Sequence, residues 1–75
     1  MTKLPQIRPR KLVKFFRKRG FEVIRQKGSH LRLAHPDGRK ITVAVHNKPI
    51  SPGTLNAILR QAQLERKKFI DLFKG

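Results

Sequence analysis

The residues best suited to chemistry are concentrated in one segment, residues 25–33, which reads Arg-Gln-Lys-Gly-Ser-His-Leu-Arg-Leu. His30 has an imidazole, which can take up or release a proton near neutral pH, so it can serve as a general base or a general acid. A glycine two positions earlier lets the backbone bend and approach a ligand closely. The candidate anion-binding residues around that point are Arg25, Lys27, Gly28, Ser29 and Arg32. The segment therefore predicts a phosphate site beside a group that transfers protons.

Cleavage of RNA is the reaction that such a site could catalyse with few parts. RNA carries its own nucleophile, the ribose 2′-hydroxyl, so a protein need only remove its proton, protonate the leaving oxygen and stabilise the crowded phosphate. Histidine, lysine and arginine suffice for these tasks. His30 is the candidate catalytic residue, and His46 is a weaker candidate for a second proton carrier that also contacts the RNA. The residues leave an alternative open, in which His30 is an ordinary surface histidine on a strand of a basic binding domain.

Several other chemistries are disfavoured by the composition. Two-metal hydrolysis needs clustered carboxylates, whereas the four acidic residues are scattered along the chain. The three histidines lack the spacing of a zinc site, and no cysteine is present. Ser29 and His30 are neighbours on an expected strand, where successive side chains point to opposite faces, so a Ser-His hydrolase pair is disfavoured. We therefore expect no metal and no small-molecule cofactor.

The charge of the chain points to a polyanionic partner. Its 75 residues contain 19 Lys and Arg against 4 Asp and Glu, which gives a formal net charge of +15. Nucleic acid is one natural partner for such a surface, and an acidic protein is another. The absence of cysteine, of a signal peptide and of a membrane-length apolar run favours a soluble, cytoplasmic protein with no membrane partner.

Secondary-structure signals divide the chain into a flexible leader over residues 1–8 and a single domain over residues 9–75. A helix is expected to start near Pro9 and to end at Gly20, because proline is tolerated in the first helical turn and glycine commonly ends a helix. Phe21 would then fold back on Phe16. Three β-rich runs follow, over about residues 21–26, 29–35 and 39–45, and Gly28 marks the turn between the first two.

The second and third runs predict a hairpin with a three-residue loop, Pro-Asp-Gly, at residues 36–38. If His35 lies opposite Arg39, two apolar pairs fall on one face of the sheet, as a correct register requires. The pairs are Leu33 with Ile41 and Leu31 with Val43. The reverse face would carry His30 and Arg32, with His46 one diagonal step from His30.

Ser51-Pro52 is a strong start signal for a second helix, whose apolar positions recur with helical spacing. A break near Leu64 would leave a possible short C-terminal helix. The expected fold class is therefore α+β, with the order α-β-β-β-α and a three-stranded antiparallel sheet covered on one face by two helices. Double-stranded-RNA-binding domains share this order, so the expected fold is dsRBD-like.

Five short segments taken together resemble the HicA family of toxins, the messenger-RNA interferases of bacterial toxin–antitoxin pairs. The first two are Arg19-Gly20-Phe21 and Arg25-Gln26-Lys27-Gly28-Ser29-His30; the third and fourth are His35-Pro36-Asp37-Gly38-Arg39 and Val43-Ala44-Val45-His46. The last is Pro52-Gly53-Thr54-Leu55 with Ile58-Leu59-Arg60-Gln61-Ala62. Their order and spacing over about residues 10–73 carry the resemblance.

The resemblance implies a dsRBD-like fold, cleavage of messenger RNA without a metal ion, and a catalytic histidine at the Gly-Ser-His position, here His30. It also implies neutralisation by a HicB-type antitoxin that covers the site. One departure is Gln63, which stands where similar proteins usually have the glycine that ends the second helix.

The resulting interpretation is an endoribonuclease toxin of a type II toxin–antitoxin system, whose partners are RNA and a HicB-type antitoxin. A non-catalytic basic RNA-binding module shares the charge and the fold but needs no histidine. A third alternative is an interaction protein whose charge serves only an acidic partner. These alternatives differ in whether RNA is cleaved, bound intact or not bound at all.

Overall fold

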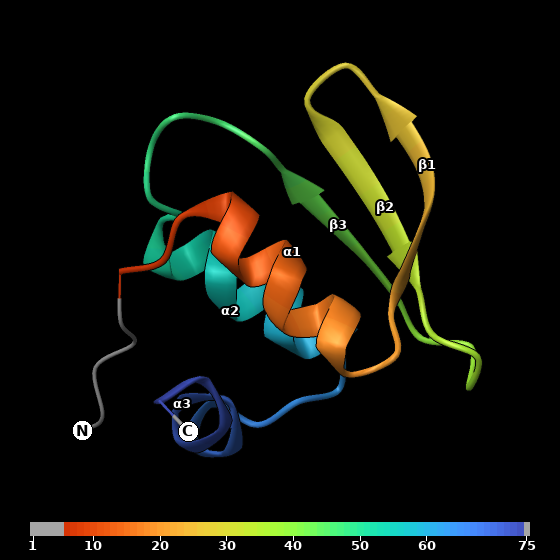
Figure 1. The fold of residues 1–75 in the computed structure, drawn as a ribbon. Helices are drawn as coiled ribbons and strands as arrows, with labels where there is room; N and C mark the ends of the chain where they lie inside the picture. Colours follow the sequence, from red (N-terminus) through yellow and green to blue (C-terminus); the bar gives the residue numbers. More distant parts are fainter. Residues whose placement is uncertain (1–5, 75) are drawn as a thin grey trace.

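The computed structural model describes residues 6–74, and within them a three-stranded antiparallel sheet packs against helices on one face (Figure 1). In chain order the elements are α1 (Pro9–Lys18), β1 (Glu22–Lys27), β2 (His30–Ala34), β3 (Lys40–Ala44), α2 (Pro52–Gln61) and α3 (Arg66–Lys74). The strand order is β1-β2-β3, so β2 is central. The predicted α+β class and the order of its elements are confirmed, and the C-terminal helix is present.

Helix α1 begins and ends as its sequence predicts. Pro9 occupies its first turn, and Gly20 follows its C-terminal end with φ 95°. The Gly20 amide donates to the carbonyl of Arg17, and the Phe21 amide donates to that of Phe16, which together form a Schellman motif. The rings of Phe16 and Phe21 lie 5.1 Å apart, edge to face. The predicted contact across this helix stop is therefore confirmed.

Replacing Gly20 by alanine should lower the free energy of unfolding by about 1–3 kcal/mol. The left-handed backbone strains any side chain there, and a Cβ would lie 2.9 Å from Nε2 of His35. Urea unfolding followed by circular dichroism measures the loss. Gly53→Ala is the matched control, because Gly53 lies in the first turn of α2 and a Cβ added there would meet no atom within 4 Å. Equal stability changes in the two variants would contradict the role given to Gly20.

The β2–β3 hairpin has the register that the loop length predicts. Leu33 pairs with Ile41 and Leu31 with Val43, and the amide of His35 donates to the carbonyl of Arg39 at 2.8 Å. Leu33, Ile41 and Val43 are buried against the helices. The opposite face of the sheet, here called the open face, carries the residues that alternate with these along the strands, such as Arg32 and Thr42.

Side chains in the 36–38 turn and on either side of it hold the hairpin together and attach it to the rest of the fold. Asp37 accepts from the amide and from Nε of Arg39, and this backbone hydrogen bond, followed by the guanidinium, lowers the pKa of the exposed Asp37 carboxyl from its ordinary 3.8. Arg39 also donates to the carbonyl of Ala62 at 2.7 Å, at the end of α2. His35 packs its ring 5.1 Å from that of Phe21. His35 is therefore a structural residue.

The break between α2 and α3 lies where the sequence predicts it. Gln63 has φ 55°, and its amide and that of Leu64 donate to the carbonyls of Arg60 and Leu59. This is a second Schellman motif, with glutamine in the left-handed position that glycine favours. The helix end is therefore kept without the glycine.

The expected leader, residues 1–8, lies partly outside the described residues, which begin at residue 6. Ile7 is 1% exposed and belongs to the hydrophobic core. Its carbonyl accepts from the amide of Ile50 at 2.8 Å, so the chain just before α1 is tied to the loop that precedes α2. The packed structure thus includes at least one residue placed in the leader.

A single cluster of buried side chains joins the helices to the sheet. Phe15 on α1 meets Phe69 on α3, with ring centroids 4.9 Å apart. Phe16 and Phe21, on the two sides of the end of α1, are also buried in this cluster. With the core on the helical side, the open face is free to carry charged side chains.

Candidate functional site

The site is built on the open face by an irregularity in β1. Val23 pairs with Leu33, but Arg25 pairs with Arg32, so one residue, Ile24, is inserted between two regular stretches of the ladder. Such a bulge reverses the alternation of side chains along the strand. Val23 therefore shares the helical side with Leu33, while Arg25 shares the open face with Arg32.

The bulge brings two cations of β1, Arg25 and Lys27, to the face that His30 and Arg32 share on β2. Lys27 lies directly opposite His30 in the register, and Arg25 lies opposite Arg32. Directly opposed residues have Cβ atoms about 4.5–5.5 Å apart, and residues two apart on one strand are separated by roughly 6.6 Å. All four side chains are exposed. We call Arg25, Lys27, His30 and Arg32 the open-face quartet.

The turn between β1 and β2 determines which residue lies opposite His30. Lys27 pairs with His30, which leaves Gly28 and Ser29 as a two-residue hairpin loop. Gly28 has φ 58°, and Ser29 is not among the described residues of positive φ, which is the pattern of a type II′ turn with glycine at its first position. The loop places the Gly28 and Ser29 backbone beside the imidazole, and the carbonyl of Ser29 accepts from the amide of Val45 at 2.7 Å.

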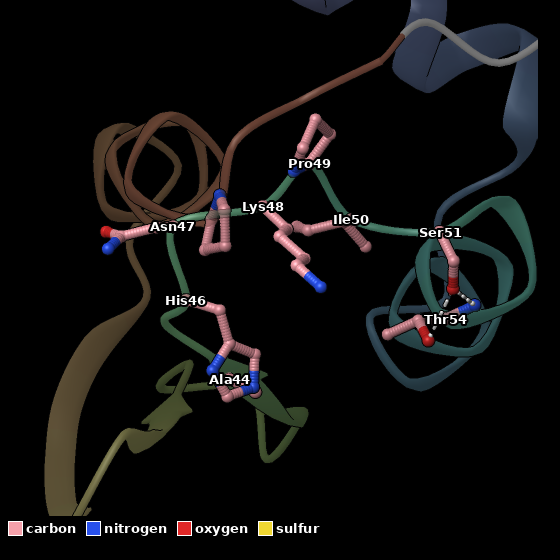
Figure 2. A pocket seen from close by; sticks show the side chains of 9 residues that line it. Ala44, His46, Asn47, Lys48, Pro49, Ile50, Ser51 and Thr54 are labelled. Carbon is pink, nitrogen blue, oxygen red and sulfur yellow. Dashed lines mark hydrogen bonds between the residues drawn. The ribbon is translucent and has the colours of Figure 1, made fainter.

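His46 lies beyond the third strand, as the expected end of that strand near residue 45 implies. Strand β3 ends at Ala44, so His46 belongs to the following loop and is exposed. It lines a pocket of about 550 Å³ between the start of α1, the loop and the start of α2. Figure 2 shows its ring lying over Ala44 in that view, and both residues line the pocket.

Ala44 connects the two histidines, and sequence reasoning gave it no role. It is the register partner of His30, on the open face, and it is also part of the wall around His46. Because its side chain is a single methyl group, it leaves space between the quartet and the pocket. Only the hairpin register, which placed Ala44 opposite His30, could have pointed to this residue.

The arrangement of the remaining polar groups bears on which reactions are feasible. Within residues 6–74, no group of three or more His, Cys, Asp or Glu side chains is placed to hold a metal ion. Salt bridges in that part of the chain join Asp37 to His35 and to Arg39, away from the quartet. The cations of the quartet are thus available to an anionic ligand. None of the described helices is long and apolar enough to cross a membrane.

Comparison with known families identifies the chain. The family model of the HicA toxin of bacterial toxin–antitoxin systems matches residues 9–64, well over half of the 75 residues. The chain belongs to the HicA toxin family. A comparison with curated proteins finds no match.

Membership of the HicA toxin family makes this protein a toxin of a toxin–antitoxin system. The matched region contains the open-face quartet, the Gly28-Ser29 turn and His46. It ends two residues before α3 begins at Arg66, so the HicA family model accounts for the sheet and the first two helices. Helix α3 lies beyond the matched segment although it contributes to the core.

Proposed function

We propose that this HicA-family toxin is a metal-independent endoribonuclease that cleaves messenger RNA and is neutralised by a HicB-type antitoxin. The observation that supports the proposal most strongly is the open-face quartet, in which an exposed imidazole is flanked by three cations. An imidazole supplies the proton transfer and the cations supply the anion site that RNA cleavage needs.

In the proposed reaction the ribose 2′-oxygen attacks the adjacent phosphorus, and the bond from phosphorus to the 5′-oxygen breaks. His30 takes the proton from the 2′-hydroxyl. Lys27 and Arg32, with the Gly28 and Ser29 backbone, hold the phosphate as negative charge builds up on its oxygens, and Arg25 adds positive charge at the next position. The products are a 2′,3′-cyclic phosphate and a 5′-hydroxyl.

The leaving 5′-oxygen needs a proton from a second donor. His46 is the candidate, because the pocket that it lines includes Ala44, and Ala44 is the register partner of His30. A proton carried by His46 would leave His30 free to act as the base. The antitoxin would then inhibit by covering the open face, and a net charge of +15 suits an acidic partner.

The reaction class is tested on a defined RNA with the purified toxin. We expect cleavage to continue in the presence of EDTA, to leave a cyclic phosphate end, and to stop when the nucleotide 5′ of the cut carries a 2′-deoxyribose. Loss of activity in EDTA, or cleavage of the deoxy substrate, would contradict attack by the 2′-hydroxyl. RNA that is shifted in a gel but stays intact would instead indicate a non-catalytic binding module.

A further inference from the structure

Helix α1 carries a row of exposed cations that the proposed reaction does not use. They are Arg10, Lys11, Lys14, Arg17 and Lys18, here called the α1 row. Among the described residues, none of these side chains takes part in a salt bridge, since both salt bridges there involve Asp37. The α1 row is therefore positive charge without an acidic neighbour to balance it.

The cations in the first half of α1 oppose the stability of the helix, whereas Arg17 and Lys18 in its last turn suit the helix dipole. Its first turn holds Arg10 and Lys11 and no acidic residue, although the helix dipole favours negative charge there. Lys14 follows Arg10 and precedes Lys18 by four residues each, and like charges at this spacing repel. Arg8, at the N-cap, makes no capping hydrogen bond through its side chain. Burial of the apolar face accounts for the formation of α1. The cations of its first turn and the like-charged pairs at four-residue spacing do not stabilise it, so their presence needs another explanation.

Two hollows make the α1 row continuous with the β1–β2 turn. One, of about 420 Å³, is lined by Arg10, Val13, Gln26, Gly28, Ser29, Leu31 and Val45. The other, of about 560 Å³, is lined by Arg10, Val13, Lys14, Arg17 and Lys18. Because Arg10 and Val13 belong to both, the surface runs without interruption from the turn beside His30 to the end of α1. Figure 1 shows α1 running alongside the sheet, with the β1–β2 turn projecting beyond it.

We propose that the RNA strand cleaved at His30 continues over the Gly28-Ser29 turn and along α1, with its phosphates on Arg10, Lys14 and Arg17. This inference rests on the proposed function and adds a path for the substrate. The ten residues of α1 extend about 15 Å at roughly 1.5 Å per residue. That length accommodates about four phosphates of a stacked strand at roughly 3.4 Å each. The α1 row is thus a binding subsite for nucleotides beyond the scissile bond.

The test compares a triple variant, Arg10→Gln, Lys14→Gln and Arg17→Gln, with a control of equal charge change on α3. The control is Lys67→Gln, Lys68→Gln and Lys74→Gln, whose side chains are also exposed. For an oligonucleotide long enough to cover α1, we expect the α1 variant to raise KM about tenfold or more with little change in kcat. A dinucleotide substrate, which cannot reach α1, should be cleaved equally by all three proteins.

Binding of an uncleavable 2′-deoxy analogue of the long oligonucleotide separates this inference from the proposed reaction. On a single strand each phosphate contact contributes roughly 0.7 to the magnitude of the slope of log K against log salt concentration. The loss of three contacts should therefore reduce that magnitude by about two. The change in salt dependence is expected even if the wild-type protein cleaves no RNA. That result would contradict the catalytic proposal and leave the proposed RNA path intact.

Three results would overturn the inference. Equal losses in the α1 and α3 variants would show a general effect of charge, and unchanged binding in the α1 variant would place the RNA elsewhere. Unchanged RNA binding together with weaker binding of an acidic antitoxin would assign the α1 row to a protein partner.

Discussion

Replacing His30 by alanine should leave the fold intact and lower the rate of RNA cleavage by about 10²–10⁴-fold, the range that a positioned general base or acid contributes. The fold should survive because His30 is exposed at the start of β2 and is absent from the hydrophobic core. Circular dichroism and urea unfolding check the fold, and single-turnover cleavage of a defined RNA gives the rate. Growth inhibition on expression should be lost in parallel.

Two further histidine variants separate proton transfer from binding. His30→Gln keeps a polar side chain but cannot exchange a proton, so it should be as inactive as the alanine variant while still binding the 2′-deoxy oligonucleotide. His46→Ala should slow cleavage less, because water can protonate a leaving oxygen in place of a side chain. Full activity in His30→Gln would reduce His30 to a binding residue, and full activity in His30→Ala would exclude it from the site.

The elements that position His30 were predictable where local chemistry determines them. The three-residue loop at 36–38 fixed the pairing of β2 with β3, and Gly20 fixed the end of α1. A break in the C-terminal helical segment was also predictable, although no glycine marks it. The exact residue at which α2 ends was harder to predict, because Gln63 takes the left-handed conformation without being glycine and therefore has no sequence signal of its own.

The surroundings of His30 were predictable only in part. The run from Phe21 to Gln26 has no glycine, and its adjacent apolar residues Val23 and Ile24 did not by themselves locate a bulge. A regular strand starting from the buried Phe21 would have directed Arg25 and Lys27 toward the helices. The pairing of β1 with β2 determines their side, and pairing depends on the whole sheet.

Replacing Phe69 by alanine should be strongly destabilising, with a loss of about 3–5 kcal/mol in the free energy of unfolding. Phe69 is fully buried, and its ring contacts those of Phe15 and Phe73 at centroid distances of 4.9 and 5.4 Å. A domain of this size has a total stability of roughly 4–11 kcal/mol, and self-repulsion among its cations reduces it. At the low end of that range the loss equals the whole stability, and a large fraction of the variant would then be unfolded at ambient temperature.

Urea and thermal unfolding measure the effect, with Lys68→Ala as the matched control because Lys68 is the exposed neighbour on the same helix. The control should change stability by no more than about 0.5 kcal/mol. Phe69 lies beyond the segment that the HicA family model matches, so a loss below about 1 kcal/mol would make α3 an appendage to a domain that is stable without it.

The expected loss at Phe69 also links α3 to the substrate path. Phe15 holds α1 against Phe69 from the buried side, while the α1 row occupies the exposed side of the same helix. In the fraction of the variant that stays folded, loosening that contact should weaken binding of long oligonucleotides more than cleavage of a dinucleotide at His30, because the sheet determines the turn and the quartet. Sulfate, which screens repulsion among the cations and strengthens apolar burial, should restore part of the stability of Phe69→Ala. No recovery in sulfate would contradict a contribution of cation repulsion to the instability of the variant.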